Sequence, residues 1–198
     1  DWVALLGTPS DLTNTAYWAY DAKIMARVAR VLGQSEDAIA YDQLFENIKQ
    51  AFCKRYLGKD GWLLRPAGSP ARRDSYSAAY GTGPKTTQDT VLDTQTGYIL
   101  PLYVGLLDDS VKDKAFAHLV ELLKDNQYCL NTGFIGTPYM NLVLSDNGRD
   151  DIAYKMFQQH NYPSWIYPIL QGATTIWERW NSYTIKNGFG PVSMNSFN

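Results

Sequence analysis

Two helical patterns follow one another near the start of the chain, and very few residues separate them. The first runs from the expected N-cap Ser10 to Gly33. Its apolar and aromatic side chains recur at the three-and-four spacing of one buried helical face, at Tyr17, Tyr20, Ile24, Val28 and Val31. A chain that opens with such a helix and resumes a helix almost at once is restricted to a fold with antiparallel helical neighbours.

The second helix has Ser35 as its expected N-cap and ends at Gly58. Its apolar stripe consists of Tyr41, Leu44, Ile48, Phe52 and Tyr56. Two helices of about twenty residues each, joined by so short a connection, must form an αα-hairpin. We expect this hairpin to be the repeating unit of the fold.

Further helical patterns alternate between buried and amphipathic types. We predict a mostly buried inner helix over 90–107, in which Pro101 introduces a kink or a break. An outer amphipathic helix follows Asp108 and Asp109, and its stripe consists of Val111, Phe116, Leu119, Val120 and Leu123. This alternation of inner and outer helices is what a ring of hairpins requires.

Three more helical segments follow. Thr137 is the expected N-cap and Pro138 the first helical residue of a helix that reaches Asn147. The next helix spans 149–160, and a short apolar segment covers 165–170. The expected buried side chains of the helix over 149–160 are Ile152, Met156 and Phe157.

The chain therefore belongs to the all-α class, with seven expected helices and no convincing period-two pattern of a strand. We interpret residues 1–198 as a single domain made of αα-hairpins that form part of a toroid. A closed ring of six hairpins needs twelve helices, so we expect the toroid to be incomplete. The chain also starts without Met, and we expect it to be a fragment of a longer protein.

A long loop over 59–89 interrupts the helical pattern. It is rich in Gly, Pro, Ser and Arg, and it carries Trp62, Tyr76 and Tyr80. Loops of this length in compact domains are usually functional or disordered, and disordered segments tend to lack aromatic residues. The loop is interpreted as part of a binding cleft, and the alternative is a surface excursion whose aromatic residues only attach it to the body.

The charge and composition exclude several kinds of partner. The net charge is −2, and the sequence contains no basic run that would gather nucleic acid or anionic lipid. The most apolar run, over 99–107, is far shorter than the roughly 20 residues that span a bilayer. We therefore predict no nucleic-acid partner and no membrane partner, and the cellular compartment stays open.

No metal site or cofactor site is expected. Cys53 and Cys129 lie far apart without metal-binding spacing, and they are interpreted as small buried hydrophobes or free thiols. His118 and His160 are expected to be solvated or capping residues. The stretch over 81–85 lacks the spacing and the preceding strand of a phosphate-binding loop.

The strongest candidate site lies over 172–180, which reads Gly, Ala, Thr, Thr, Ile, Trp, Glu, Arg, Trp. Aromatic faces stack well on the apolar faces of sugar rings, and Arg179 would favour the charged form of Glu178. Glu178 would then act as a base. The alternative is that Trp177 and Trp180 are core residues on one helical face, with Glu178 and Arg179 exposed as a solvated pair.

Several runs resemble bacterial α-L-rhamnosidases of glycoside hydrolase family 78. The segment over 172–180, together with Tyr162–Pro163–Ser164–Trp165, is similar to the closing catalytic segment of that family. Asp1–Trp2, Asp93–Thr94–Gln95–Thr96 and the run over 131–139, which reads Asn, Thr, Gly, Phe, Ile, Gly, Thr, Pro, Tyr, extend the similarity in order along nearly the whole chain.

The resemblance implies an (α/α)6 catalytic domain that hydrolyses terminal α-L-rhamnosides with inversion. It makes Glu178 the general base, and its implied substrate-binding residues are Asp1, Trp2, Trp62, Trp165, Arg179 and Trp180. The family places its general acid in an upstream motif that nothing in this chain matches. We therefore expect the partners to be a rhamnose-containing glycoside or polysaccharide and the remainder of the parent chain, and we expect the isolated chain to be inactive.

Two other interpretations remain open. One is a different glycosidase on a helical toroid, or a polysaccharide lyase, in which Arg72 and Arg73 would be the candidates to neutralise a uronate. The other is a catalytically inert carbohydrate-binding fragment.

Overall fold

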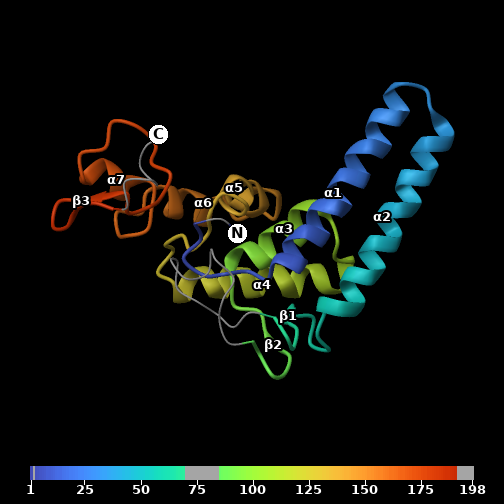
Figure 1. The fold of residues 1–198 in the computed structure, drawn as a ribbon, viewed down its shortest axis with the longest axis horizontal. Helices are drawn as coiled ribbons and strands as arrows, with labels where there is room; N and C mark the ends of the chain where they lie inside the picture. Colours follow the sequence, from blue (N-terminus) through green and yellow to red (C-terminus); the bar gives the residue numbers. More distant parts are fainter. Residues whose placement is uncertain (2, 70–84, 191–198) are drawn as a thin grey trace.

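A computed structural model describes residues 1, 3–69 and 85–190 (Figure 1). Within them, the helices are α1 (Ser10–Val31), α2 (Ser35–Tyr56), α3 (Gln95–Val104), α4 (Asp109–Asp125), α5 (Thr137–Asp146), α6 (Asp150–Phe157) and α7 (Ile166–Leu170). Two antiparallel pairs of two-residue strands join them, β1 (Leu64–Arg65) with β2 (Thr90–Val91), and β3 (Tyr183–Thr184) with β4 (Gly188–Phe189). The all-α prediction is confirmed, although the sequence pattern does not predict these four short strands.

Six of the helices form three consecutive hairpins. α1 packs on α2, α3 on α4 and α5 on α6, while α3 also contacts both α1 and α5. α3 is the inner helix of the three hairpins, because all its residues except Tyr103 are buried. This arrangement is the one expected of part of a six-hairpin toroid.

The inner helix is shorter than predicted. It begins at Gln95 rather than at residue 90, because Thr90 and Val91 pair with Arg65 and Leu64. Pro101 lies inside α3 without ending it. The helix ends where Gly105 takes a positive φ of 87° and Leu106 donates its N–H to the Pro101 carbonyl.

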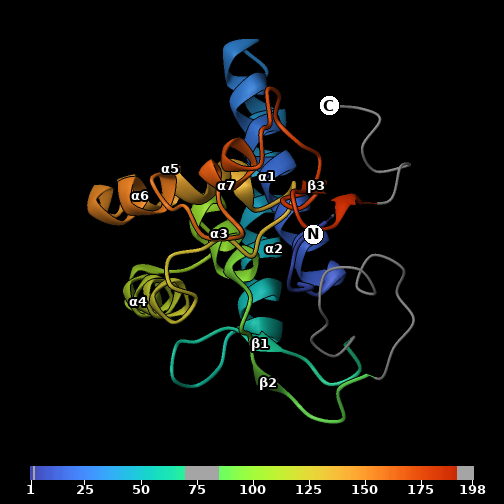
Figure 2. The ribbon, with the colours of Figure 1, turned by 90° about the vertical axis from the view of Figure 1, so that its left-hand side faces the viewer.

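The predicted buried stripe of α1 is wrong over its second half. Ile24 and Val28 are exposed, and Val31 is 86% exposed. The side chains that pack inward lie on an adjacent face of small residues, Ala16, Ala19, Ala22, Ala26 and Ala29. The connected ends of α1 and α2 project beyond the other helices (Figures 1 and 2), and the larger apolar residues Ile24, Val28 and Val31 stay exposed there.

The predicted helix starts are displaced by one residue. Ser10, Ser35 and Thr137 are the first helical residues rather than the N-caps, whose positions are taken by Pro9, Gln34 and Gly136. Pro138 does lie in the first turn of α5, as predicted.

Some of the individual burial predictions are also wrong. α6 ends at Phe157, whose side chain is exposed rather than buried. His118 is neither solvated nor capping, because its side chain is only 11% exposed and stacks on Trp62, with ring centroids 4.3 Å apart. His160 is exposed, as expected.

Neither a membrane-spanning helix nor a metal-binding cluster occurs in the described residues. Their helices lack the combination of length and apolar character needed to cross a bilayer. No group of three or more His, Cys, Asp or Glu side chains within residues 1, 3–69 and 85–190 is arranged to hold a metal ion. Both cysteines are free thiols, and Cys129 is buried.

Candidate active site

Glu178 lies in an irregular segment that follows α7, at the end of the molecule opposite the tip of the α1–α2 hairpin (Figure 1). The segment leaves α7 through Gly172, whose φ of 89° favours glycine. Residues 173–182 are not helical. The alternative in which Trp177 and Trp180 share one helical face is therefore wrong.

Glu178 lines a cavity of about 180 Å³. The other lining residues come from the start of the chain, the loop before α5, the start of α5 and the segment around α7: Val3, Gly133, Phe134, Thr137, Pro138, Trp165, Ile176, Trp177 and Trp180. The Oε2 atom of Glu178 is buried. Most of this lining is apolar or aromatic, and Glu178 is the one acid among the described residues that form it.

Trp180 is held in the cavity wall by a hydrogen bond and by ring contacts. Its Nε1–H donates to the Thr132 carbonyl at 2.9 Å, which ties the segment after α7 to the loop before α5. The ring meets Trp165 edge to face, with centroids 6.0 Å apart, and Trp165 in turn contacts Phe157 at 5.9 Å. The predicted site residues Glu178, Trp165 and Trp180 therefore surround one cavity.

The carboxylate of Asp1 holds the loop that anchors Trp180. Its Oδ1 accepts the Ile135 N–H at 2.8 Å. Its Oδ2 accepts the Gly133 N–H at 2.8 Å and the Thr96 hydroxyl at 2.6 Å. Both carboxylate oxygens thus bind protein donors, so Asp1 stabilises the structure of this loop. The expected contact of Asp1 with sugar hydroxyls stays a prediction.

The run over 93–96 supports the same loop from α3. The side-chain amide of Gln95 donates to the Cys129 carbonyl at 3.0 Å, and its oxygen accepts the Asn131 N–H at 2.9 Å. The Asn131 carbonyl accepts the N–H groups of Leu5 and Leu6. Thr94 accepts a hydrogen bond from Thr8 at 2.8 Å. Three runs quoted for the family resemblance thus meet in one polar network.

Gly136 shows how tightly this loop approaches α3. A Cβ atom built on Gly136 would lie 2.2 Å from the Thr96 Oγ1 and 2.9 Å from the Thr132 Cγ2. Only glycine leaves room for the Thr96 hydroxyl, which itself binds Asp1.

The remaining predicted site residues lie elsewhere or stay untested. Trp62 does not line the Glu178 cavity, because its ring is stacked on His118 of α4. Trp2 lies outside the described residues. Arg179 lies close enough to Tyr162 to lower the pKa of that phenol, although burial is the larger effect and raises it. That Arg179 keeps Glu178 ionised stays a prediction.

Sequence reasoning missed the residues that hold the cavity walls. Thr96, Thr132 and the backbone of Gly133 and Ile135 carry out this task. The sequence feature that could have identified them is their position inside the runs over 93–96 and 131–139, which carry the family resemblance. Their chemistry alone does not reveal the role, because most of the groups involved belong to the backbone.

The chain is similar to known proteins along its whole length. Residues 1–198 match the family described as the bacterial alpha-L-rhamnosidase 6 hairpin glycosidase domain. An α-L-rhamnosidase of Streptomyces avermitilis is 38% identical over 199 residues, which cover 100% of this chain and 16% of that protein. An α-L-rhamnosidase of Formosa agariphila is 37% identical over 191 residues, which cover 96% of this chain and 18% of that protein.

Solved structures show the same similarity. The crystal structure of the Streptomyces avermitilis α-L-rhamnosidase complexed with L-rhamnose has a TM-score of 0.81 over 100% of this chain and 16% of that one, with 38% identity. The α-L-rhamnosidase of Aspergillus terreus has a TM-score of 0.73 and 30% identity over 92% of this chain and 18% of that one. The chain thus spans less than a fifth of the length of these relatives.

Proposed function

Because this chain belongs to the family of bacterial α-L-rhamnosidase six-hairpin glycosidase domains, we propose that it supplies the general-base half of a site that hydrolyses terminal α-L-rhamnosides with inversion. The observation that carries this proposal is the position of Glu178 in a cavity walled by Trp165, Trp177 and Trp180. A relative with 38% identity has been crystallised with L-rhamnose, which supports a carbohydrate ligand of this kind.

Glu178 draws a proton from a water molecule as that water attacks the anomeric carbon. An inverting glycosidase needs this base and, on the other face of the sugar, a carboxylic acid that protonates the leaving oxygen. The apolar tryptophan faces suit the carbon face of the ring and the methyl group of a 6-deoxy sugar. Exclusion of bulk water from the Oε2 side strengthens the electrostatic interactions of the carboxylate with the developing charge.

The general acid is proposed to come from outside residues 1–198. Glu178 is the one acid that lines its cavity among the described residues, and an inverting pair needs carboxyl groups roughly 6.5–9.5 Å apart. The three described hairpins form one domain with the remaining helices of the toroid. On this proposal the isolated chain binds sugar weakly at most and does not hydrolyse it.

The role of Glu178 is tested by Glu178→Gln in the full-length protein, with an aryl α-L-rhamnoside as substrate. The substitution keeps the shape of the side chain but removes the base, so kcat should fall by about 10²–10⁴-fold. The matched control is Glu46→Gln, which changes an exposed glutamate of α2 and should leave kcat unchanged. Full turnover by Glu178→Gln, with an unchanged thermal transition, would refute the assignment.

The stereochemistry has its own measurement. Proton NMR of the first product from an α-L-rhamnoside should show the β-anomer before mutarotation. With Glu178→Ala, added azide should restore turnover and give a β-rhamnosyl azide, because the small anion takes the place of the activated water. An α-configured first product would instead indicate a covalent intermediate and a nucleophilic carboxylate.

A further inference from the structure

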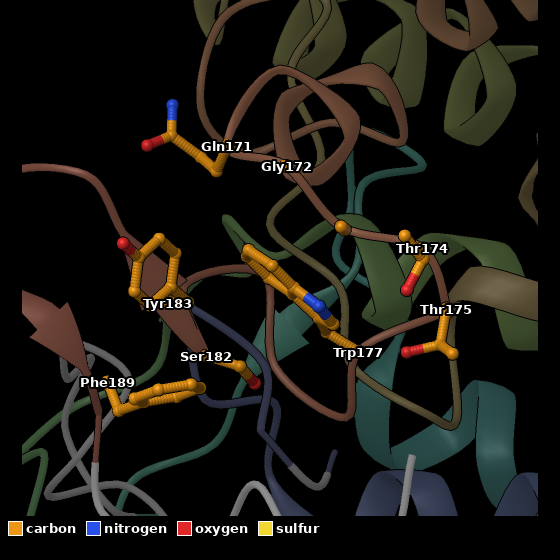
Figure 3. A pocket seen from close by; sticks show the side chains of 9 residues that line it. Gln171, Gly172, Thr174, Thr175, Trp177, Ser182, Tyr183 and Phe189 are labelled. Atoms are coloured by element: carbon orange, nitrogen blue, oxygen red, sulfur yellow. The ribbon is translucent and has the colours of Figure 1, made fainter.

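The walls of the Glu178 cavity are held in place in two different ways. Trp177 is held by its ring, which meets Tyr183 edge to face, with centroids 6.3 Å apart, beside a second cavity of about 550 Å³ (Figure 3). Val3 forms another part of the wall, and it is the one described residue of the first eight that does so. Its small aliphatic side chain carries no aromatic ring and no polar group. The position of Val3 in the wall therefore depends on its backbone.

The backbone of Val3 is strained. Its φ is 53°, which lies in the left-handed region that a β-branched residue rarely adopts. Such a conformation persists only where the surrounding contacts fix the chain. On one side of Val3, the Asp1 carboxylate binds the N–H groups of Gly133 and Ile135. The contacts on the other side therefore decide whether Val3 stays in the cavity wall.

Residues 4–8, here called the N-terminal segment, make these other contacts. The N–H groups of Leu5 and Leu6 donate to the Asn131 carbonyl at 3.0 and 3.4 Å. The Thr8 hydroxyl donates to the Thr94 hydroxyl at 2.8 Å. These are hydrogen bonds between neutral groups, which are about half as strong as those that involve a charged group.

Arg65 of β1 adds a charged donor to the N-terminal segment. Its Nη2 atom donates to the Gly7 carbonyl at 2.9 Å and lies 3.5 Å from the Oδ1 atom of Asp93. The Arg65 side chain is only 4% exposed. Of the hydrogen bonds described for the N-terminal segment, the one from Arg65 should therefore be the strongest.

A buried arginine is an expensive way to stabilise a fold. Moving a guanidinium out of water carries a large desolvation penalty, and apolar replacements of buried ion pairs are often neutral or stabilising. The guanidinium does, however, present several donors in a fixed planar geometry. At Arg65 this geometry joins β1, the N-terminal segment and Asp93, which precedes α3. Arg65 is thus better suited to fixing a position than to stabilising the core.

We propose that Arg65 is a positioning residue of the active site, which keeps Val3 in the wall of the Glu178 cavity through its bond to the Gly7 carbonyl. The proposal rests on the function proposed above and adds to it a residue that does not line the cavity. Without the guanidinium, a shift of the N-terminal segment releases the strain at Val3. The wall then moves away from the bound sugar, while Glu178 keeps its place.

Arg65→Met and Arg65→Lys test this proposal in the full-length protein, with an aryl α-L-rhamnoside as substrate. Arg65→Met removes the donor, so KM should rise by about 2- to 12-fold, the worth of one hydrogen bond, with kcat unchanged. Arg65→Lys should raise KM less, because it keeps the charge but loses the planar geometry. The control is Arg149→Met, which removes a guanidinium that binds Asp151 and does not line the cavity, and it should leave KM unchanged.

The split between KM and kcat separates positioning from a purely structural role. A loss of folded protein lowers the apparent kcat, because fewer molecules are active, but it leaves KM unchanged. A lower kcat with an unchanged KM in Arg65→Met would therefore overturn the proposal.

The strain at Val3 is tested with a matched pair of variants. Val3→Gly removes the side chain together with the strain, because glycine adopts a positive φ freely. Val3→Ala removes the same two methyl groups but keeps a Cβ atom and its conflict with the backbone. Arg65→Met should therefore raise KM less when it is combined with Val3→Gly than when it is combined with Val3→Ala. Equal increases in the two backgrounds would overturn the link between Arg65 and the strained residue.

Hydrogen exchange examines the N-terminal segment without reference to hydrolysis. In Arg65→Met the amide hydrogens of Leu5 and Leu6 should exchange faster than in the unmodified protein, by a larger factor than the amides of α2. Unchanged exchange at both positions would overturn the positioning role of Arg65. Absence of rhamnoside hydrolysis by the unmodified protein would instead overturn the proposed function, and the exchange rates would still show whether Arg65 holds the N-terminal segment.

Discussion

Replacement of Asp1 by alanine should disturb the candidate site, although Asp1 itself does not line the Glu178 cavity. Asp1 is absent from the cavity wall, yet its carboxylate binds Gly133 and Ile135, and the former follows Thr132, which anchors Trp180. Loss of the carboxylate frees two backbone N–H groups and the Thr96 hydroxyl. The loop before α5 should then shift, and Trp180 should follow it.

The structure sets the size of the effect. A hydrogen bond to a charged group contributes about 1.5–3 kcal/mol, so three such bonds would sum to roughly 4.5–9 kcal/mol. The sum is an upper limit, because Asp1 is only half-buried and water replaces part of what is lost. We expect the free energy of unfolding to fall by about 2–4 kcal/mol. The loss lowers the Tm of the domain that contains these helices.

Three measurements on the full-length protein check this expectation. Calorimetry should show the lower Tm, tryptophan emission should shift to longer wavelength as Trp180 becomes wetter, and kcat/KM should fall. The effect of Asp1→Asn should lie between that of the unmodified protein and that of Asp1→Ala. The asparagine keeps one acceptor oxygen, but its NH₂ group faces a donor. The control is Asp113→Ala on the exposed face of α4. If Asp1→Ala matches this control in all three measurements, the loop does not depend on Asp1.

One further substitution and one change of pH test other contacts in the structure. Gly136→Ala places a methyl group 2.2 Å from the Thr96 Oγ1, so we expect a loss of stability of about 1–3 kcal/mol by denaturant unfolding, and an unchanged midpoint would contradict the close approach. Burial raises the pKa of Tyr17 to about 12, and the hydrogen bond with Tyr20 raises that of Tyr103 to about 12. Because tyrosines in the unfolded chain ionise near pH 10, their contribution to stability is complete below pH 10 and should be lost between pH 10 and 12, and unfolding transitions measured across this range should show that decrease.

The hairpins were predictable from the sequence because their evidence is local. The three-and-four spacing and the short connection at Gly33 suffice to place α1 and α2 antiparallel, and α2 buries Ile48, Phe52 and Tyr56 as expected. The error on α1 has a physical cause. A close helix contact selects small side chains, so α1 turns its alanine face inward, although a hydrophobicity pattern gives more weight to Ile24 and Val28.

The boundaries of α3 could not be predicted in the same way. Thr90 and Val91 extend the apolar pattern of the inner helix, but their backbone pairs with Leu64 and Arg65 across a gap of more than twenty residues. The choice between helix and strand is therefore made by a partner distant in sequence, which a local period does not reveal.

The candidate site also has a part that the local sequence predicts and a part that depends on contacts between distant residues. The candidate itself, a glutamate between two tryptophans, is visible in nine consecutive residues, and all three of these side chains line one cavity. The support of the cavity is different, because Asp1 meets partners 95, 132 and 134 residues away, and two of these are backbone N–H groups that every residue except proline carries. Side-chain identity thus reports the groups proposed to perform chemistry, while the groups that position them become visible only once the chain is folded.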